Sequence, residues 1–253
     1  LGSDGRASGP VDGHQGAATK AADNDLILYK AIDPMLFRVS LLAAALAVCA
    51  APDALAQTAR ARASAAADLD ARFAQAQADP ALAQQLLASG RKAAAVCANC
   101  HGANGNSPST LVPNLAGQNP AYLLEQVRQF ADGRRRDMWM EGMVRALEAD
   151  EKIGIVLFYS AQQVTVHPAA DAALAARGQA YYGKVCFRCH GTDGRGNAQI
   201  ARVAGQQAGY LSKTLTLYRD GKSPRADSIM QPNTRQMADA DIAAVAAYVS
   251  TMP

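Results

Sequence analysis

The spacing of apolar and polar residues predicts a chain that is mostly helical. Apolar positions recur with a helical period in three pairs of segments: about 80–96 and 169–185, 122–130 and 210–218, and 150–162 and 239–251. Alanine-rich stretches favour helix, and the chain has few of the β-branched and aromatic runs that strands prefer. We therefore expect an all-α fold.

The predicted helices belong to one unit that occurs twice. Residues of the first half return 88 to 90 positions later: Gly90 and Gly178, the Ala-Gly-Gln triplets at 116–118 and 204–206, Tyr122 and Tyr210, Asp132 and Asp220, and Met140 and Met230. This nearly constant offset indicates two copies of one domain, 79–166 and 167–253. Each copy is small for an unaided hydrophobic core, so a bulky cofactor at its centre would help it to fold.

The segment before the repeats is predicted to direct export. Arg38 precedes an apolar run over 39–51, and the Ala-Leu-Ala sequence at 54–56 fits the cleavage site of a signal peptide that begins at about residue 35. The apolar run is too short to span a bilayer comfortably, which disfavours a membrane anchor. We expect a periplasmic protein, and Cys49 would leave with the leader.

The segments on either side of this leader carry no predicted chemistry. Residues 1–34 are rich in Gly, Ser and Asp without periodicity, which predicts disorder or upstream sequence absent from the mature protein. Residues 57–78 are alanine-rich and have no counterpart in the second copy, so they form either an extra helix or a flexible lead-in. A lipid anchor on Cys49 is disfavoured because Val48, and not a small residue, precedes it.

The charge of the chain argues against nucleic acid as a partner. The 25 Lys and Arg residues and the 22 Asp and Glu residues leave a formal net charge of +3. Binding to nucleic acid requires a concentrated basic face, which this mild excess does not supply.

Four of the five cysteines occupy two identical motifs, Cys97-Ala-Asn-Cys100-His101 and Cys186-Phe-Arg-Cys189-His190. Covalent attachment of a c-type haem needs two thiols that reach the vinyl groups on one edge of the porphyrin, followed at once by an imidazole that turns onto the iron. The C-x-x-C-H spacing supplies this set. We predict two covalently bound c-type haems, attached at Cys97, Cys100, Cys186 and Cys189, with His101 and His190 as iron ligands.

Three other kinds of site use the same residue types. Structural zinc usually takes four ligands from one constellation, whereas each copy offers three. A thioredoxin-like C-x-x-C requires a βαβ setting, which the predicted helices do not provide. Disulfides are chemically feasible in an exported protein, but they give no reason for the two histidines.

The sixth iron ligand of the second copy is expected further along the chain. Methionine at this position keeps the reduction potential high and closes the iron to small ligands. Met230 and Met237 follow the motif before the terminal Met252, and Met237 falls on the apolar core position of Leu147. Met230 is therefore the predicted ligand.

In the first copy three methionines lie close together, and Met138, Met140 and Met143 are all candidates. The repeat alignment selects Met140, because it matches Met230 and lies at a similar distance from the histidine of its motif, 39 residues against 40. Met138 and Met143 stay open as alternatives, with Met140 then packing as core.

A backbone carbonyl is expected to orient each iron-binding histidine. Pro113 lies between the first motif and Gly117, where its carbonyl oxygen could accept the Nδ1 proton of His101. Ala201 occupies the matching place in the second copy. An ordinary loop proline is the alternative interpretation of Pro113.

Two helix glycines, Gly90 and Gly178, have two interpretations. They either let the first helix of each copy approach the last helix closely, or simply fray the helix in which they lie.

Basic residues precede both predicted methionine ligands. Arg134, Arg135 and Arg136 come before Met140, and Lys222 and Arg225 come before Met230. They would neutralise haem propionates or dock an acidic partner. A solvated surface is the alternative.

The repeats resemble the dihaem cytochromes c of the cytochrome c4 type. The likeness runs from about residue 79 to the C-terminus and rests on the two Cys-x-x-Cys-His-Gly motifs, the Ala-Gly-Gln-containing blocks followed by Tyr-Leu, the Asp-Gly turns, and the segments around Met140 and Met230. The resemblance implies two class I cytochrome c domains, each a small helical shell around a haem with His/Met ligation, packed about a pseudo-twofold axis. It also implies a periplasmic location and association with the membrane through partners. Pro232-Asn233 replaces Gly142-Met143 in the second copy, which predicts a different path for the segment that carries Met230.

We expect an electron carrier and not an enzyme, because an iron closed by His and Met offers no site to a substrate. Its partners would be redox proteins: a quinol-oxidising cytochrome complex or a dehydrogenase as donor, and a terminal oxidase or reductase as acceptor. The alternative is the electron-accepting cytochrome subunit of a periplasmic dehydrogenase. A haem enzyme, such as a dihaem peroxidase or a thiosulfate-oxidising cytochrome, is the third hypothesis, and the paired methionines count against it.

Overall fold

The structure, a computed structural model, describes residues 56–57, 60–61, 63–226 and 228–253. Both repeats lie in one compact unit, Thr58–Pro253. The described part of the chain is helical and contains no strand, apart from an isolated antiparallel bridge between Arg135 and Arg225. The predicted all-α fold is confirmed. The predicted leader up to residue 55, with Cys49, lies outside the described residues and stays a prediction.

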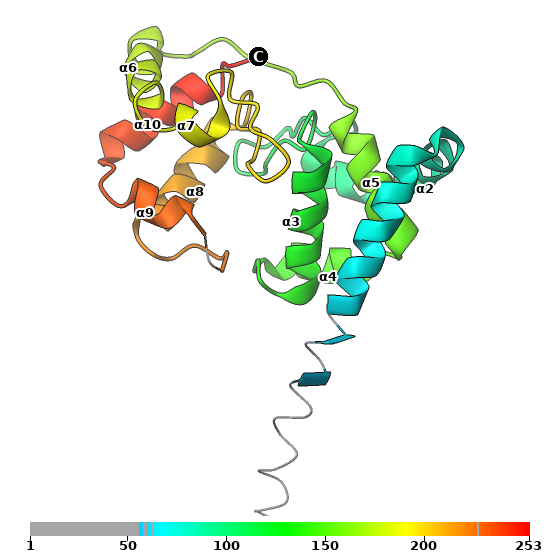
Figure 1. The fold of residues 1–253 in the computed structure, drawn as a ribbon. Coiled ribbons are helices and arrows are strands. Elements are labelled where there is room, and N and C mark those ends of the chain that lie inside the picture. The colour runs from blue at the N-terminus through cyan, green and yellow to red at the C-terminus, as the bar shows by residue number, and fades with distance from the viewer. Residues whose placement is uncertain (1–55, 58–59, 62, 227) are drawn as a thin grey trace, which may run out of the picture. The chain divides into compact units, whose positions relative to one another are not determined.

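The helices follow the repeat (Figure 1). The first repeat contains α2 (Pro80–His101), α3 (Pro120–Asp132), α4 (Met138–Arg145) and α5 (Ala149–Ser160). The second repeat contains α6 (Ala172–Tyr182), α7 (Phe187–His190), α8 (Ala208–Arg219), α9 (Met230–Thr234) and α10 (Asp239–Val249). The three predicted pairs are α2 and α6, α3 and α8, and α5 and α10. The sequence pattern does not predict the short helices α4 and α9, which carry Met140 and Met230.

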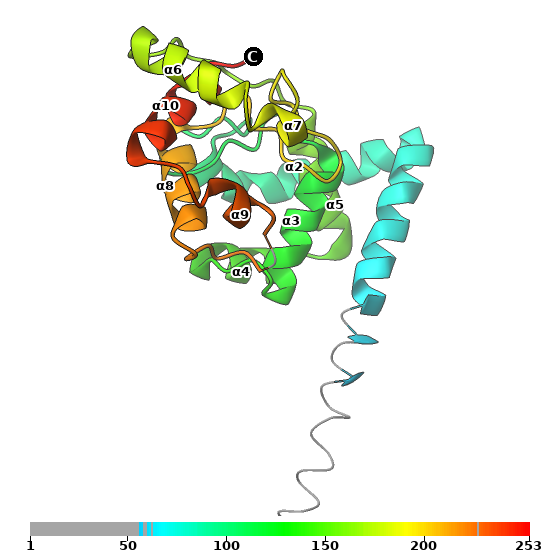
Figure 2. The same cartoon turned by 60° about the vertical axis from the view of Figure 1, so that its left-hand side comes forward.

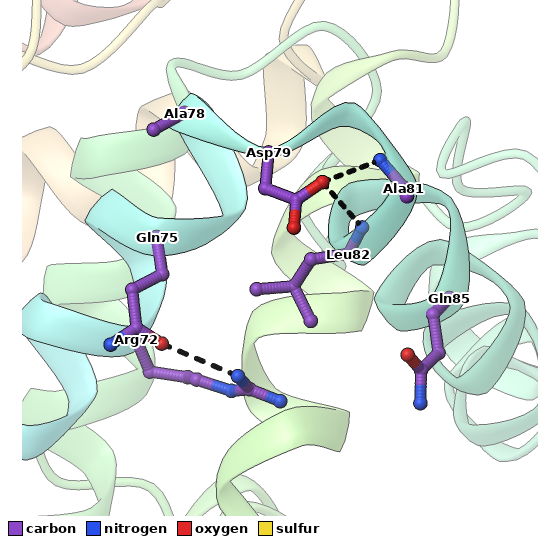
Figure 3. A pocket seen from close by; sticks show the side chains of 7 residues that line it. All are labelled: Arg72, Gln75, Ala78, Asp79, Ala81, Leu82 and Gln85. Carbon is purple, nitrogen blue, oxygen red and sulfur yellow. Dashed lines mark hydrogen bonds between the residues drawn. The ribbon is translucent and has the colours of Figure 1, made fainter.

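The start of α2 is fixed by Asp79 and Pro80. The Asp79 carboxylate accepts hydrogen bonds from the backbone N–H groups of Ala81 (2.9 Å) and Leu82 (3.2 Å), as Figure 3 shows. Pro80 occupies the first turn, where a backbone N–H would have no acceptor within the helix, so its absence costs no hydrogen bond. Residues 63–78 form a further helix, drawn in cyan in Figure 2, and the chain bends at Asp79 between this helix and α2.

Of the two interpretations of the lead-in, an extra helix or a flexible segment, the structure supports the extra helix. This helix, 63–78, packs on the first repeat. Leu69, Phe73 and Ala76 are buried in the hydrophobic core of that repeat. Arg72 adds an ion pair with Asp150 at 2.9 Å. The core of the first repeat is therefore covered by an additional helix, which has no counterpart in the sequence of the second repeat.

Close contact between the first and last helices of each repeat decides the role of the two helix glycines. A Cβ atom on Gly90 in α2 would come to 1.9 Å from the carbonyl carbon of Gly154 in α5. A Cβ atom on Gly178 in α6 would come to 1.9 Å from the carbonyl oxygen of Ala244 in α10. The interpretation of close approach is confirmed, and glycine is required at both positions for steric reasons.

Each repeat has its own hydrophobic cluster. The first is built mainly from α2, α3 and α5 with the helix at 63–78, and Cys97 and Met140 pack against it. The second is built mainly from α8 and α10, and Cys186 and Met230 pack against it. In both repeats, one cysteine and one predicted methionine ligand thus meet the same core.

The segment before the second C-x-x-C-H motif differs from its counterpart. In the first repeat α2 runs without interruption through the motif to His101. In the second, α6 ends at Tyr182 and the separate α7 begins at Phe187. Gly183 stands where the first repeat has Ala94, and glycine sustains a helix much less well than alanine.

Candidate functional site

A cavity of ≈ 270 Å³ lies beside the second C-x-x-C-H motif. Cys186, Cys189, His190 and Met230 all line it. The rest of the lining is largely apolar and includes Leu211, Leu215, Met237, Val245 and Val249. Three residues of α3 in the first repeat also reach it: Tyr122, Gln126 and Gln129. The structure therefore brings together all four residues predicted to hold the second haem.

Both motif histidines are oriented by a backbone carbonyl. His101 Nδ1 lies 2.9 Å from the carbonyl oxygen of Pro113, and His190 Nδ1 lies 2.9 Å from that of Ala201. A carbonyl oxygen can only accept, so Nδ1 carries the proton and Nε2 is left with a free lone pair. Burial lowers the pKa of both histidines, although the carbonyl opposes this, which favours the neutral imidazole that binds metal. The predicted hydrogen bonds are confirmed.

The cysteines of the two motifs are free thiols in the structure. Burial raises the pKa of Cys97, and it raises the pKa of Cys186 to about 11. Thiols of this kind are poor redox nucleophiles, which disfavours the thioredoxin-like reading. Within the described residues, no group of three or more His, Cys, Asp and Glu side chains is arranged to hold a metal ion.

The methionines of the first repeat differ in exposure. Met138 is 79% exposed and Met143 is 40% exposed, whereas Met140 packs against the first core together with Cys97. In the second repeat Met237 is buried in the core, as the match with Leu147 predicts. Of the three methionines of α4, Met140 is thus the one that packs against the core, and in the second repeat both Met230 and Met237 line the cavity.

The segments that carry these methionines also differ in backbone, as the sequence departure predicts. Met140 is the third residue of α4, and the carboxylate of the N-cap residue Asp137 accepts hydrogen bonds from the N–H groups of Trp139 and Met140. Met230 begins the shorter helix α9, which has Pro232 in its first turn.

Two of the basic residues turn inward and meet across the repeats. The guanidinium groups of Arg135 and Arg225 each donate to the hydroxyl oxygen of Tyr210, both at 3.2 Å. Burial raises the pKa of Tyr210, but the two cations overcome this effect and lower the pKa to about 8. Among the described residues, neither arginine has a carboxylate partner, and the buried Nε of Arg225 has no hydrogen-bond partner. Sequence reasoning missed this cluster, because Tyr210 was visible only as a repeat landmark.

The remaining basic residues are ordinary surface groups. Arg134 is exposed and pairs with Glu125 and Asp132. Arg136 is exposed and pairs with Glu141, and Lys222 is exposed. For these three the interpretation as solvated surface is supported.

The residues fit a covalent c-type haem. In the second repeat two thiols, a neutral imidazole with a free Nε2 and a thioether line one largely apolar cavity. Arg225 also lines it, and its buried Nε has no hydrogen-bond partner. These are the donor types of a His/Met haem iron, with a cation near by that suits a propionate. In the first repeat Cys97 and Met140 pack against the core, and the buried His101 is held by the Pro113 carbonyl, whereas Cys100 is exposed.

The helical fold and the two motifs define a c-type cytochrome. The family model of cytochrome c matches residues 175–253. A cytochrome c4 of Pseudomonas aeruginosa is 37% identical over 174 residues, covering 64% of this chain and 86% of that protein. The chain belongs to the cytochrome c4 family and is a c-type electron carrier with covalently bound haems.

Two further relatives add detail. The crystal structure of reduced recombinant cytochrome c4 from Pseudomonas stutzeri superposes with a TM-score of 0.60 at 31% identity, covering 65% of this chain and 97% of that one. A thiosulfate dehydrogenase electron acceptor of Thiomonas intermedia is 35% identical over 173 residues, covering 63% of this chain and 80% of that protein. The chain therefore resembles proteins that pass electrons to or from other redox proteins.

Proposed function

We propose that the chain carries two haems, one in each of two cytochrome c domains, 79–166 and 167–253. The first haem is bound covalently by Cys97 and Cys100 and the second by Cys186 and Cys189. The observation that carries this proposal is the cavity shared by the second motif and Met230, together with the matching set in the first repeat.

In this proposal His101 and Met140 would hold the first iron, and His190 and Met230 would hold the second. When bound, the haems supply a reversible one-electron ferric/ferrous couple. The thiols would attach the group covalently, the imidazoles, oriented by their carbonyl hydrogen bonds, would bind the iron, and the thioethers would supply its other protein ligands. Arg225 lines the cavity, and its unpartnered Nε would suit a propionate.

Electron transfer without catalysis follows from this ligation, because neither iron keeps an open position for a substrate. The proposed partners are redox proteins: a quinol-oxidising cytochrome complex or a dehydrogenase as donor, and a terminal oxidase or reductase as acceptor. We place the protein in the periplasm, with peripheral association with the membrane through these partners. None of the helices in the described part of the chain has the length and apolar content needed to span a bilayer.

A spectroscopic redox titration of the mature protein tests the proposal. Two haems per chain, two potentials and the absorption of methionine-ligated ferric iron in both are the expected result. Carbon monoxide added to the reduced protein should bind slowly or not at all. Rapid, stoichiometric binding at either iron would contradict the closed sites.

A second function is favoured by the relatives named as electron acceptors of thiosulfate dehydrogenase. In this version the chain is the electron-accepting cytochrome subunit of a periplasmic dehydrogenase. Affinity purification under native conditions separates the two proposals. A catalytic chain recovered in equal amounts supports the subunit, and recovery of the cytochrome alone supports the free carrier.

A further inference from the structure

Two glutamine side chains reach from one repeat to the other at matching positions. Gln118 accepts the N–H of Arg202 at 2.7 Å and donates to the Arg202 carbonyl oxygen at 2.8 Å. Gln206 accepts the N–H of Asn114 at 2.7 Å and donates to the Asn114 carbonyl oxygen at 3.0 Å. Each amide therefore holds both backbone groups of one residue in the opposite repeat.

Each residue held in this way follows the carbonyl that orients a histidine. The N–H of Asn114 and the C=O of Pro113 belong to the same planar peptide unit. A hydrogen-bond chain therefore runs from Gln206 through this peptide to His101. The second chain runs from Gln118, through the peptide between Ala201 and Arg202, to His190.

Both chains are shielded from water where they begin. Gln118 is 7% exposed and Gln206 is 8% exposed. Hydrogen bonds in such a medium are stronger than in water, and successive bonds polarise one another. An acceptor on the peptide N–H makes the carbonyl on the other side of the same peptide a better acceptor for the histidine proton.

We infer that each glutamine is a positioning residue for the haem iron of the opposite repeat. Gln206 fixes the imidazole of His101, and Gln118 fixes that of His190. The inference rests on the proposed ligation by these histidines. It makes the contact between the repeats part of the ligand environment of both irons, because separating the repeats would break both chains at once.

The effect on the iron has a definite direction. A histidine that donates a strong Nδ1 hydrogen bond is a more basic ligand, and a more basic ligand stabilises ferric iron. Removing the glutamine weakens that bond, so the potential of the haem in the opposite repeat rises. If a glutamine only held the two repeats together, its removal would change the potentials of both haems to a similar extent.

The test uses the complete haem-bound protein and the substitutions Gln118→Met and Gln206→Met, which keep side-chain length but remove both hydrogen bonds. Two quantities are measured: the potential of each haem and the paramagnetically shifted proton NMR signals of the ferric haem methyl groups, which report the orientation of the axial imidazole. Met140→His and Met230→His variants assign the signals to their repeats. Gln206→Met should change mainly the first haem, and Gln118→Met mainly the second.

Two further variants serve as a control and as a substitute if a variant does not fold. Gln162→Met removes an amide hydrogen bond to Phe158 within the first repeat and should leave both haems unchanged. If Gln206→Met does not fold, Gln206→Glu replaces the amide with a stronger acceptor for the Asn114 N–H. The potential of the first haem should then fall instead of rise, with little change at the second.

The crossed pattern supports the inference. Equal changes at both haems, or changes confined to the haem of the substituted repeat, overturn it. A protein with fewer than two haems, or without His/Met spectra in the unsubstituted form, would instead refute the proposed function.

Discussion

The backbone of Gly90 lies against that of Gly154 so closely that a methyl group on Gly90 would come to 1.9 Å from the Gly154 carbonyl carbon. Gly90→Ala must therefore push α2 and α5 apart or bend one of them. Overpacking of this kind costs about 3 kcal/mol of unfolding free energy. Chemical denaturation of the haem-bound protein, followed by circular dichroism, measures the loss.

Gly142 supplies the matched control for this substitution, because it also lies in a helix and a Cβ atom there would meet nothing within 4 Å. Gly142→Ala should leave stability unchanged or raise it by about 0.5 kcal/mol. Equal effects of the two substitutions would show that the contact between α2 and α5 is not tight in solution.

The lead-in helix is expected to be part of the stable core of the first repeat. Phe73 is buried there, so Phe73→Ala should cost about 3 kcal/mol of unfolding free energy. Arg72→Met removes an ion pair that is partly exposed on both sides and should destabilise the protein much less than Phe73→Ala does. Thermal and denaturant unfolding compare the two variants. A negligible effect of Phe73→Ala would show that the helix at 63–78 is detached in solution.

Sequence patterns predicted those features that covalent chemistry or the repeat dictates. The C-x-x-C-H spacing is set by the porphyrin, and it identified His101 and His190 as predicted iron ligands. The repeat offset then indicated Met140 and Met230 as the second ligands. Helix period and alanine content predicted three helix pairs, with ends that differ by a few residues. In the first repeat α2 continues through the haem motif, whereas in the second α6 ends before it. We attribute this difference to Gly183, which replaces Ala94, and the periodicity of apolar residues does not show its effect.

Features that depend on how the repeats pack could not be predicted. Gln118 and Gln206 appeared only as landmarks, because their hydrogen bonds join residues that are 84 and 92 positions apart. Tyr210 gave no local signal for the same reason: Arg135, one of its two cationic neighbours, comes from the other repeat. The repeat itself does give one indication of these contacts. A polar residue that occurs at the same position in both copies, as Gln118 and Gln206 do, is expected to have the same environment in each.

Tyr210 is predicted to titrate at unusually low pH. Arg135 and Arg225 lower its pKa to about 8 against burial, while the unfolded chain keeps a value near 10. Between these values the folded protein has lost the proton and the unfolded chain retains it, so this group adds stability as the pH rises from about 8 to 10. The contribution disappears as the pH falls through the folded pKa.

NMR of protein labelled at the Cζ carbon of tyrosine measures this pKa directly. The chain has eight tyrosines, and Tyr210→Phe identifies the signal. Unfolding free energies of the two proteins should diverge by up to about 2 kcal/mol between pH 8 and 10. A pKa near 10 in the haem-bound protein would contradict the prediction.

The methionine ligands give the sharpest prediction for the haem sites. Met230→Ala should open the second iron, so that the reduced protein binds one equivalent of carbon monoxide and the potential of that haem falls. Met237→Leu is the matched control, because Met237 is buried in the same core but is predicted to pack and not to ligate. It should cost less than about 1.5 kcal/mol in stability and leave the iron closed.

In the first repeat the same measurement separates Met140 from its two neighbours. Met140→Ala should admit one equivalent of carbon monoxide and remove the methionine-to-iron absorption of one haem. Met138→Ala and Met143→Ala should do neither, because both side chains are exposed, whereas Met140 packs against the core of the repeat. Carbon monoxide binding by the Met143→Ala protein, with Met140→Ala still closed, would move the ligand by one helical turn of α4 and would show that the repeat alignment fails in this helix.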